Sequence, residues 1–213
     1  SDNGMHLNTK KTKEMSFTFS KRIRVDDVFL RAGSEVIERV QEFKILGLIL
    51  SSDLTWASHV KYIVAKANKR LYAICQLVRC GFASGDISAV YCSLIRPLLE
   101  YAAPVWHPGL TGLLSDEVEH VQKRCMHIIF PDLSYSDALF VGGLQRLSVR
   151  RETAVAKLFA EIKNPNHILH SLLPIKPINQ GLSTRDTYPY RMKIGKTSRI
   201  SRSFINYCIK NRM

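Results

Sequence analysis

Apolar and polar residues alternate along the first part of the chain, as they do in half-buried β-strands. The alternation is clearest over residues 15–19 and 22–25, and Gly33 followed by Ser34 is a turn signal. Residues 43–50 form an apolar run rich in Ile and Leu, which is short enough for a buried strand. This pattern predicts a small antiparallel sheet before Ser51.

After Ser51 the spacing of apolar residues changes to that of a long amphipathic helix. Thr55 or Asp53 can cap the start of this helix, and Gly81 can end it. The apolar face, which we predict to be buried, consists of Val60, Ile63, Val64, Ala67, Leu71, Ile74, Leu77 and Val78.

Further helices are predicted downstream. The second begins near residues 84–86, and Pro97 is expected to kink or end it because proline has no amide hydrogen. The third has Ser115 as its N-cap, acids in its first turn, and Pro131 as its stop. The fourth covers residues 149–162. The apolar positions of the second and third helices are Ile87, Val90, Tyr91, Leu94 and Leu98, then Val118, Val121, Cys125 and Ile128.

These elements predict an α+β fold class. Short antiparallel strands occupy residues 1–51, and a mainly helical domain occupies residues 52–173. Residues 174–213 form a basic tail that we expect to be extended and partly disordered, because its apolar periodicity is weak before residues 204–209.

Composition excludes several classes of protein. The chain is 46% hydrophobic and 23% charged, as is ordinary for a globular protein. Its apolar runs are far shorter than the roughly 20 residues that span a membrane, and no signal-peptide pattern opens the sequence. The five cysteines are odd in number and lack a Cys-x-x-Cys motif, so we expect reduced thiols and no metal site. The predicted location is intracellular, in the nucleus or the cytoplasm, and the protein is not expected to be secreted or to bind a membrane.

Net charge points to a polyanionic partner. The chain carries a formal charge of +13 with a pI near 9.7, and nucleic acid is the commonest partner of so basic a protein. Basic residues lie on the polar side of the long helix and throughout the tail. They are Lys61, Lys66, Lys69 and Arg70 on the helix, and Arg185, Arg191, Lys193, Lys196, Arg199, Arg202, Lys210 and Arg212 in the tail, where Asp186 is the one acid.

Five short motifs follow one another along the chain. They are LNTKKTKEMSF (7–17), VQEFKILG (40–47), DLTWASHV (53–60), YCSLIRPLLEYAAPVW (91–106) and VQKR (121–124). In order and spacing they resemble the LNxxKTxxMxF, VxxFKYLG, LxWxxHI, YxSxIRPxLxYxxxVW and xQxR segments of non-LTR (LINE-like, jockey and CR1-type) retrotransposon reverse transcriptases. Ile45 replaces the usual Tyr of the second motif. The resemblance covers about residues 7–173.

The resemblance implies a place in the polymerase. Residues 7–17 would follow the catalytic Tyr-x-Asp-Asp strand, residues 43–50 would belong to the primer grip, and the helices would form the thumb. A polymerase holds its duplex by the phosphates without reading bases, which requires cations on a firm frame. Gly47 suits a strand that a second backbone or a nucleic acid approaches closely. The expected partners are RNA and DNA as template–primer, bound without sequence preference, and the oligomeric state is left open.

The catalytic carboxylates of such an enzyme are not found at the matching place in this chain. Metal-dependent phosphoryl transfer needs carboxylates that hold magnesium. The one Asp-Asp pair, Asp26-Asp27, follows the Lys11-Thr12 motif instead of preceding it, and we interpret it as a turn. We therefore expect a C-terminal fragment that is inactive alone and holds no cofactor, whereas the parent polymerase would use magnesium. Lys11 matches a family lysine near the nucleotide.

Other interpretations remain open. The chain can be a non-catalytic remnant of a retroelement that binds nucleic acid or another protein. Residues 8–17 also resemble a short N-terminal segment of the AlkB homologue 8 family, but the iron and methyl-donor motifs of that family do not occur here. Trp56 and Trp106 are interpreted as core anchors, and His59 and His120 as surface or capping groups. The candidate nucleic-acid contacts are Lys11, Lys44, Gly47, Lys61, Lys66, Lys69, Arg70, Arg191, Lys193, Lys196, Arg199 and Arg202.

Overall fold

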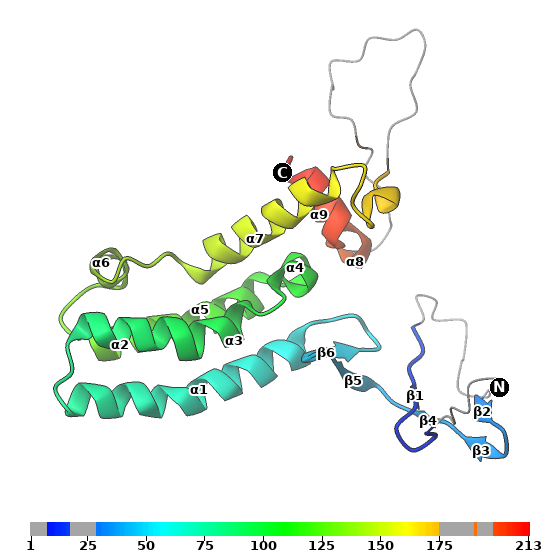
Figure 1. The fold of residues 1–213 in the computed structure, drawn as a ribbon, viewed down its shortest axis with the longest axis horizontal. Coiled ribbons are helices and arrows are strands. Elements are labelled where there is room, and N and C mark those ends of the chain that lie inside the picture. The colour runs from blue at the N-terminus through cyan, green and yellow to red at the C-terminus, as the bar shows by residue number, and fades with distance from the viewer. Residues whose placement is uncertain (1–7, 18–28, 175–189, 191–197) are drawn as a thin grey trace, which may run out of the picture. The chain divides into compact units, whose positions relative to one another are not determined.

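The computed structural model describes residues 8–17, 29–174, 190 and 198–213. Over these residues the fold is α+β, with short strands followed by a series of helices (Figure 1). The chain divides into two compact units, Ser1–Tyr62 and Ile63–Met213, called unit 1 and unit 2 below. The predicted strand at residues 22–25 and the Asp26-Asp27 turn lie outside the described residues.

Unit 1 contains three separate pairs of short strands. β1 (Lys13–Glu14) runs parallel to β4 (Glu38–Arg39), while β2 (Arg31–Ala32) and β3 (Glu35–Val36) form an antiparallel hairpin around Gly33. β5 (Glu42–Ile45) and β6 (Leu48–Ser51) form a second hairpin. The prediction of one antiparallel sheet is therefore wrong for the described part of the unit, because one pair is parallel and the three pairs do not join.

The apolar run at residues 43–50 is a hairpin, which corrects its prediction as a single buried strand. Phe43 pairs with Leu50, and the chain reverses at Leu46 and Gly47. Both turn residues have positive φ, 47° and 86°, as in the turns that favour glycine at the second position. The positive φ of Gly47 in this turn is a conformation that favours glycine.

α1 (Ala57–Arg79) confirms the predicted long helix. The amide of Gly81, with φ of 77°, donates to the carbonyl of Val78, and the amide of Phe82 donates to that of Leu77. These two bonds are the Schellman motif, so Gly81 ends the helix as expected. Five residues of the predicted stripe are buried, with exposed fractions of 5% or less at Val60, Ile63, Ala67, Leu71 and Ile74. Val64 and Leu77 are half-buried, and Val78, predicted to be buried, is exposed near the end of the helix.

The second predicted helix does not end at Pro97. α2 (Ser84–Val90) continues through a π-helical turn, η1 (Tyr91–Ile95), into α3 (Arg96–Glu100). The amide of Arg96 donates to the carbonyl of Tyr91, five residues earlier, and this wider turn accommodates the proline that follows. The wider turn also moves the buried face to Ile87, Tyr91, Ile95 and Leu99, whereas Leu94, predicted to be apolar-facing, is exposed.

The third helix begins earlier than predicted. α4 (Ala103–Trp106) and the short η2 (His107–Gly109) lead into α5 (Gly112–Ile129). Thr111 is the N-cap, because its side chain accepts a hydrogen bond from the amide of Leu114 at 3.3 Å. Ser115 instead accepts one from the Arg151 guanidinium at 3.0 Å. Trp106 is fully buried, as expected of a core anchor.

The last helices of unit 2 include elements that the sequence pattern did not predict. α6 (Tyr135–Val141) precedes α7 (Leu147–Ile162), which matches the fourth predicted helix. η3 (His170–Leu172), α8 (Ser198–Ser201) and α9 (Phe204–Lys210) follow. α9 packs on α7, so the end of the predicted extended tail is folded. The two helices share a cluster of buried apolar residues, which consists of Val155, Phe159, Ile162, Leu173, Cys208 and Ile209.

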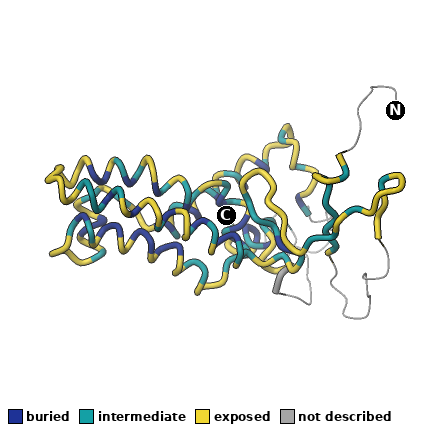
Figure 2. Tube along the Cα trace, turned by 90° about the horizontal axis from the view of Figure 1, so that it is seen from below, coloured by how far each residue is buried: buried dark blue, intermediate teal, exposed yellow. Residues whose placement is uncertain are grey.

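Burial follows single faces of the helices of unit 2 (Figure 2). α7 contacts α3, α4, α5 and α9, which makes it the central element of the unit. Over the part of the chain that the structure describes, the helices are too short or too polar to cross a bilayer.

Candidate nucleic-acid interface

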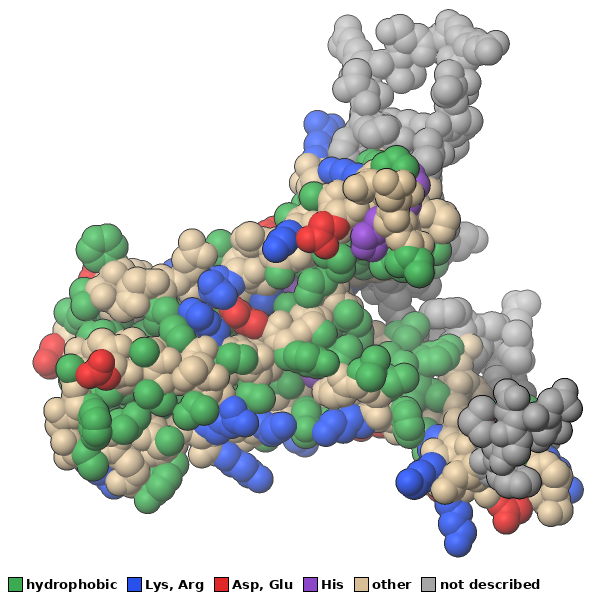
Figure 3. All heavy atoms as spheres, in the orientation of Figure 1, with side chains coloured by type: hydrophobic (Ala, Val, Ile, Leu, Met, Phe, Trp, Pro, Cys, Tyr) green, Lys and Arg blue, Asp and Glu red, His purple; other side chains and the backbone are tan. Residues whose placement is uncertain are grey.

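The solvent-facing side of α1 carries only positive charge. Among its 23 residues there is no Asp or Glu. In unit 2 the exposed cations of the helix are Lys66, Lys69, Arg70 and Arg79, and Lys61 is exposed on the part of α1 that belongs to unit 1. Figure 3 shows basic side chains along the edge formed by α1. The buried stripe of the same helix fixes its orientation, so these cations are presented on a rigid support.

Two arginines beside this face are held by hydrogen bonds. The guanidinium of Arg70 donates to the backbone carbonyl of Leu94, in the π-helical turn. Arg124 of α5 donates to the side-chain carbonyl of Asn68 at 3.4 Å, which places this exposed cation next to α1. Both contacts lie within unit 2 and leave guanidinium hydrogens for other acceptors, because each guanidinium has five N–H donors. These arginines therefore add positioned charge to the borders of the α1 face.

The other predicted contacts are divided between the two units. Lys11 is exposed, next to β1. Lys44 donates to the Tyr62 hydroxyl at 2.7 Å, and its ammonium lies 4.7 Å from the Tyr62 ring centroid. Lys44 is therefore held against α1 within unit 1, and Gly47 forms the hairpin turn. Arg202 is exposed and Arg199 lies in α8, while Arg191, Lys193 and Lys196 lie outside the described residues.

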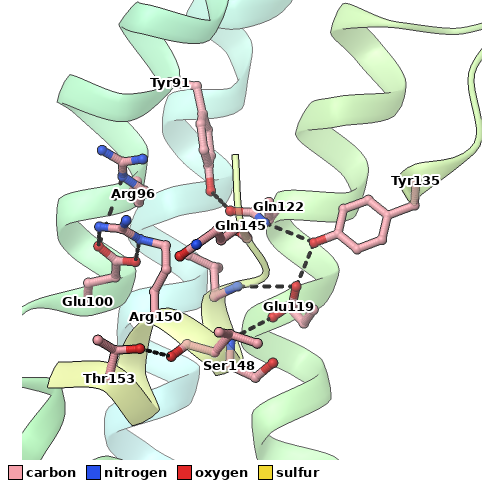
Figure 4. A network of polar contacts seen from close by, with 12 residues as sticks. Tyr91, Arg96, Glu100, Glu119, Gln122, Tyr135, Gln145, Ser148, Arg150 and Thr153 are labelled. Carbon is pink, nitrogen blue, oxygen red and sulfur yellow. Dashed lines mark hydrogen bonds and ion pairs between the residues drawn. The ribbon is translucent and has the colours of Figure 1, made fainter. Parts of the chain in front are cut away.

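A buried polar network joins α5, α6 and α7 of unit 2 (Figure 4). Tyr135 donates to Glu119 at 2.5 Å, and the two carboxylate oxygens of Glu119 accept from the amides of Leu147 and Ser148 at 3.3 and 3.1 Å. Gln122 accepts from Tyr91 at 2.5 Å and donates to Tyr135 at 2.9 Å. Glu119 thus caps α7, because the side chain of the N-cap residue Arg146 makes no capping hydrogen bond.

An ion pair borders this network. Arg150 contacts both oxygens of Glu100, one of them at 3.0 Å, and Arg96 lies 3.9 Å from Glu100. Hydrogen bonding to Glu100 is the main cause that raises the pKa of Arg150. The network links α5, α6 and α7, and the ion pair links α3 to α7. We assign them a structural role, because their polar groups are hydrogen-bonded to one another and to the backbone within the helix packing.

Arg151 is fully buried at the junction of α4, α5 and α7. It donates to His107 Nδ1 at 3.4 Å and to Ser115, and its guanidinium carbon lies 5.6 Å from the Trp106 ring centroid. Burial lowers the pKa of Arg151. Burial, and next the charge of Arg151, lower the pKa of His107 to about 4. His59, interpreted from the sequence as a surface or capping group, is also buried, and burial lowers its pKa.

His107 is expected to make stability depend on pH. Its pKa is lower in the folded chain than the ordinary value of 6.5, so the folded state binds fewer protons and loses stability as pH falls from 6.5 toward 4. His107→Gln keeps an acceptor for Arg151 and cannot titrate. Urea unfolding at pH 7 and 4.5 should show that the variant loses about 1–2 kcal/mol less than the wild type, after discounting for partial exposure. Comparing the two proteins cancels the titration of His59 and the carboxylates, and equal losses would contradict this role.

Sequence reasoning missed three residues of the α1 surface. Arg79 extends the row of cations, Arg124 comes from α5, and the Tyr72 side chain is exposed on the same helix. The helical spacing was the available signal for Arg79 and Tyr72, because both residues lie off the apolar stripe. Arg124 could not be assigned from the sequence, because its position beside Asn68 depends on how α5 packs.

The described part of the chain contains no candidate metal site. Within residues 8–17, 29–174, 190 and 198–213, no three His, Cys, Asp or Glu side chains are grouped so as to hold a metal ion. Comparison with protein-family models, with curated proteins and with solved structures gives no match. The function therefore has to be inferred from the sequence motifs and the geometry of the chain.

Proposed function

We propose that this chain is the palm-end and thumb part of a non-LTR retrotransposon reverse transcriptase, and that it holds RNA and DNA template–primer by the phosphates. The observation that supports this most is the exposed face of α1, which bears cations and no acid along 23 residues. The opposite face of the helix is buried. A cationic face on a fixed helix fits a phosphate backbone and carries no means of reading bases.

The distribution of acids supports the same proposal. Asp116, Glu117 and Glu119 lie in the first half of α5, and Glu100 is paired with arginines. None of the 18 acidic residues of the chain lies on α1, so the charged side chains of this helix are all positive. A charge excess gathered on one helix attracts a polyanion more strongly than the same excess spread over the surface, because the fields of close charges add.

The proposed role in catalysis is to position the nucleic acid. In the parent polymerase, magnesium bound by palm carboxylates would supply the charge stabilisation for phosphoryl transfer. By the resemblance, the β5–β6 hairpin would lie at the primer and α1 would lie along the template–primer. The alternative of a non-catalytic retroelement remnant uses the same cationic face and makes the same prediction for binding.

Binding of the wild-type chain to nucleic acid is expected to be steeply salt-dependent and indifferent to sequence. Each phosphate contact contributes about −0.9 to the slope of log K against log salt on duplex. If most of the five α1 cations make one contact each, the slope is about −3 to −4. Fluorescence anisotropy with several unrelated duplexes over a range of salt measures it. A slope near zero, or strong preference for one sequence, would reject the proposal.

A further inference from the structure

An aromatic side chain is exposed within the cationic surface of unit 2. Tyr72 lies on α1 with 69% of its surface exposed. Lys69 precedes it by three residues, which places the two side chains on neighbouring positions of the helix surface. Asn68, one turn before Tyr72, accepts a hydrogen bond from Arg124. Arg79 lies two turns farther along the helix, about 10 Å from Tyr72 at 1.5 Å per residue.

This arrangement combines the two elements of single-strand recognition. Cations along a surface hold the phosphates, and an exposed aromatic ring stacks on a base. A base inside a duplex is already stacked on both faces and cannot reach such a ring. An unpaired base presents a free face, and stacking on it is largely independent of base identity because every base has a π-face.

We propose that the α1 surface around Tyr72 binds single-stranded nucleic acid, with the Tyr72 ring stacked on an unpaired base. Lys69, Arg79 and Arg124 then contact the flanking phosphates. This inference rests on the proposed function and names a substrate feature for the same surface: a strand with unpaired bases, as a template has beyond the region where it is paired.

Replacing Tyr72 separates stacking from charge. Tyr72→Ala is expected to weaken binding to an oligouridine about 5- to 100-fold, the range found for losing one stacked base. The salt slope should stay the same, because tyrosine carries no charge. Tyr72→Phe should bind as the wild type does, because the ring is retained. Binding to a fully paired hairpin with the same number of phosphates should change less than about twofold. Anisotropy titrations of the full chain measure all four quantities.

Phe140→Ala provides the matched control. Phe140 is an aromatic residue of α6 with 87% exposure, in a short helix that contains Asp137 and no cation. This variant should bind both ligands as the wild type does. Loss of oligouridine affinity in Phe140→Ala, no loss in Tyr72→Ala, or equal losses for oligouridine and hairpin in Tyr72→Ala would each overturn the stacking proposal. If the wild type binds neither ligand in a salt-dependent way, the proposed function itself fails.

Discussion

Replacing Lys61, Lys66 and Lys69 of α1 by alanine together is expected to weaken nucleic-acid binding about 100-fold or more at 0.1 M salt. Each lost phosphate contact removes the release of about one counterion, and this release contributes roughly tenfold in affinity at that salt concentration. The slope of log K against log salt should become shallower by about three. All duplex sequences should be affected alike, because phosphate contacts carry no sequence information. Filter binding or anisotropy over a salt series measures both quantities.

A second triple variant controls for total charge. Lys10→Ala, Lys157→Ala and Lys210→Ala remove three exposed lysines from other parts of the chain and change the net charge equally. If binding depends only on net charge, the two triple variants will lose the same affinity, and the assignment to α1 will be wrong. Arg70 is better replaced separately, because its guanidinium also donates to the Leu94 carbonyl. Arg70→Ala is therefore expected to reduce stability as well as binding.

The long helix was predictable because one local rule determines it. Apolar residues recur at helical spacing from Val60 to Val78, and Gly81 supplies the left-handed residue that a Schellman end requires. No distant contact is needed to obtain either feature. The exposure of Lys66 and Lys69 then follows, since residues opposite a buried stripe face the solvent.

The hairpin and the π-helical turn could not be predicted from the same kind of pattern. Apart from Lys44, residues 43–50 are apolar on both sides of Gly47, so periodicity alone does not distinguish one buried strand from a hairpin of two short strands. Pro97 ordinarily ends a helix, and the wider turn that keeps the helix continuous has no spacing signature of its own. A regular helix would place Tyr91 and Leu94 on the same apolar face, whereas the structure buries Tyr91 and exposes Leu94.

The folded end of the tail depends on tertiary contacts. Phe204 to Lys210 is a single helix of seven residues, too short to be stable in isolation. Its burial against α7 brings Cys208 and Ile209 to Phe159, far away in the sequence. Periodicity at residues 204–209 was the available signal, but the surface that would receive this helix could be identified only from the structure. In the same way, Arg124 of α5 could be assigned to the α1 surface only from the structure.

Glu119 is expected to be the polar residue on which the packing of α5, α6 and α7 depends most. Glu119→Ala leaves the Tyr135 hydroxyl and the amides of Leu147 and Ser148 without their buried acceptor. Each unsatisfied buried group costs about 1–3 kcal/mol, and α7 loses its cap, so the free energy of unfolding should fall by about 3–5 kcal/mol. A loss of that size lowers the melting temperature by about 10 °C in a chain of this length.

The measurement has to report on unit 2 alone, because two compact units can unfold separately. Trp106 is buried in unit 2 and Trp56 lies in unit 1, so a Trp56→Phe background makes tryptophan fluorescence specific for unit 2. Glu117→Ala is the matched control, since it removes an exposed acid from the same helix and should change stability by less than about 0.5 kcal/mol. Glu119→Gln retains one acceptor oxygen and should lie between the two. If Glu119→Ala is no less stable than Glu117→Ala, the carboxylate is not what holds α7 to α5, and apolar packing alone would account for the junction.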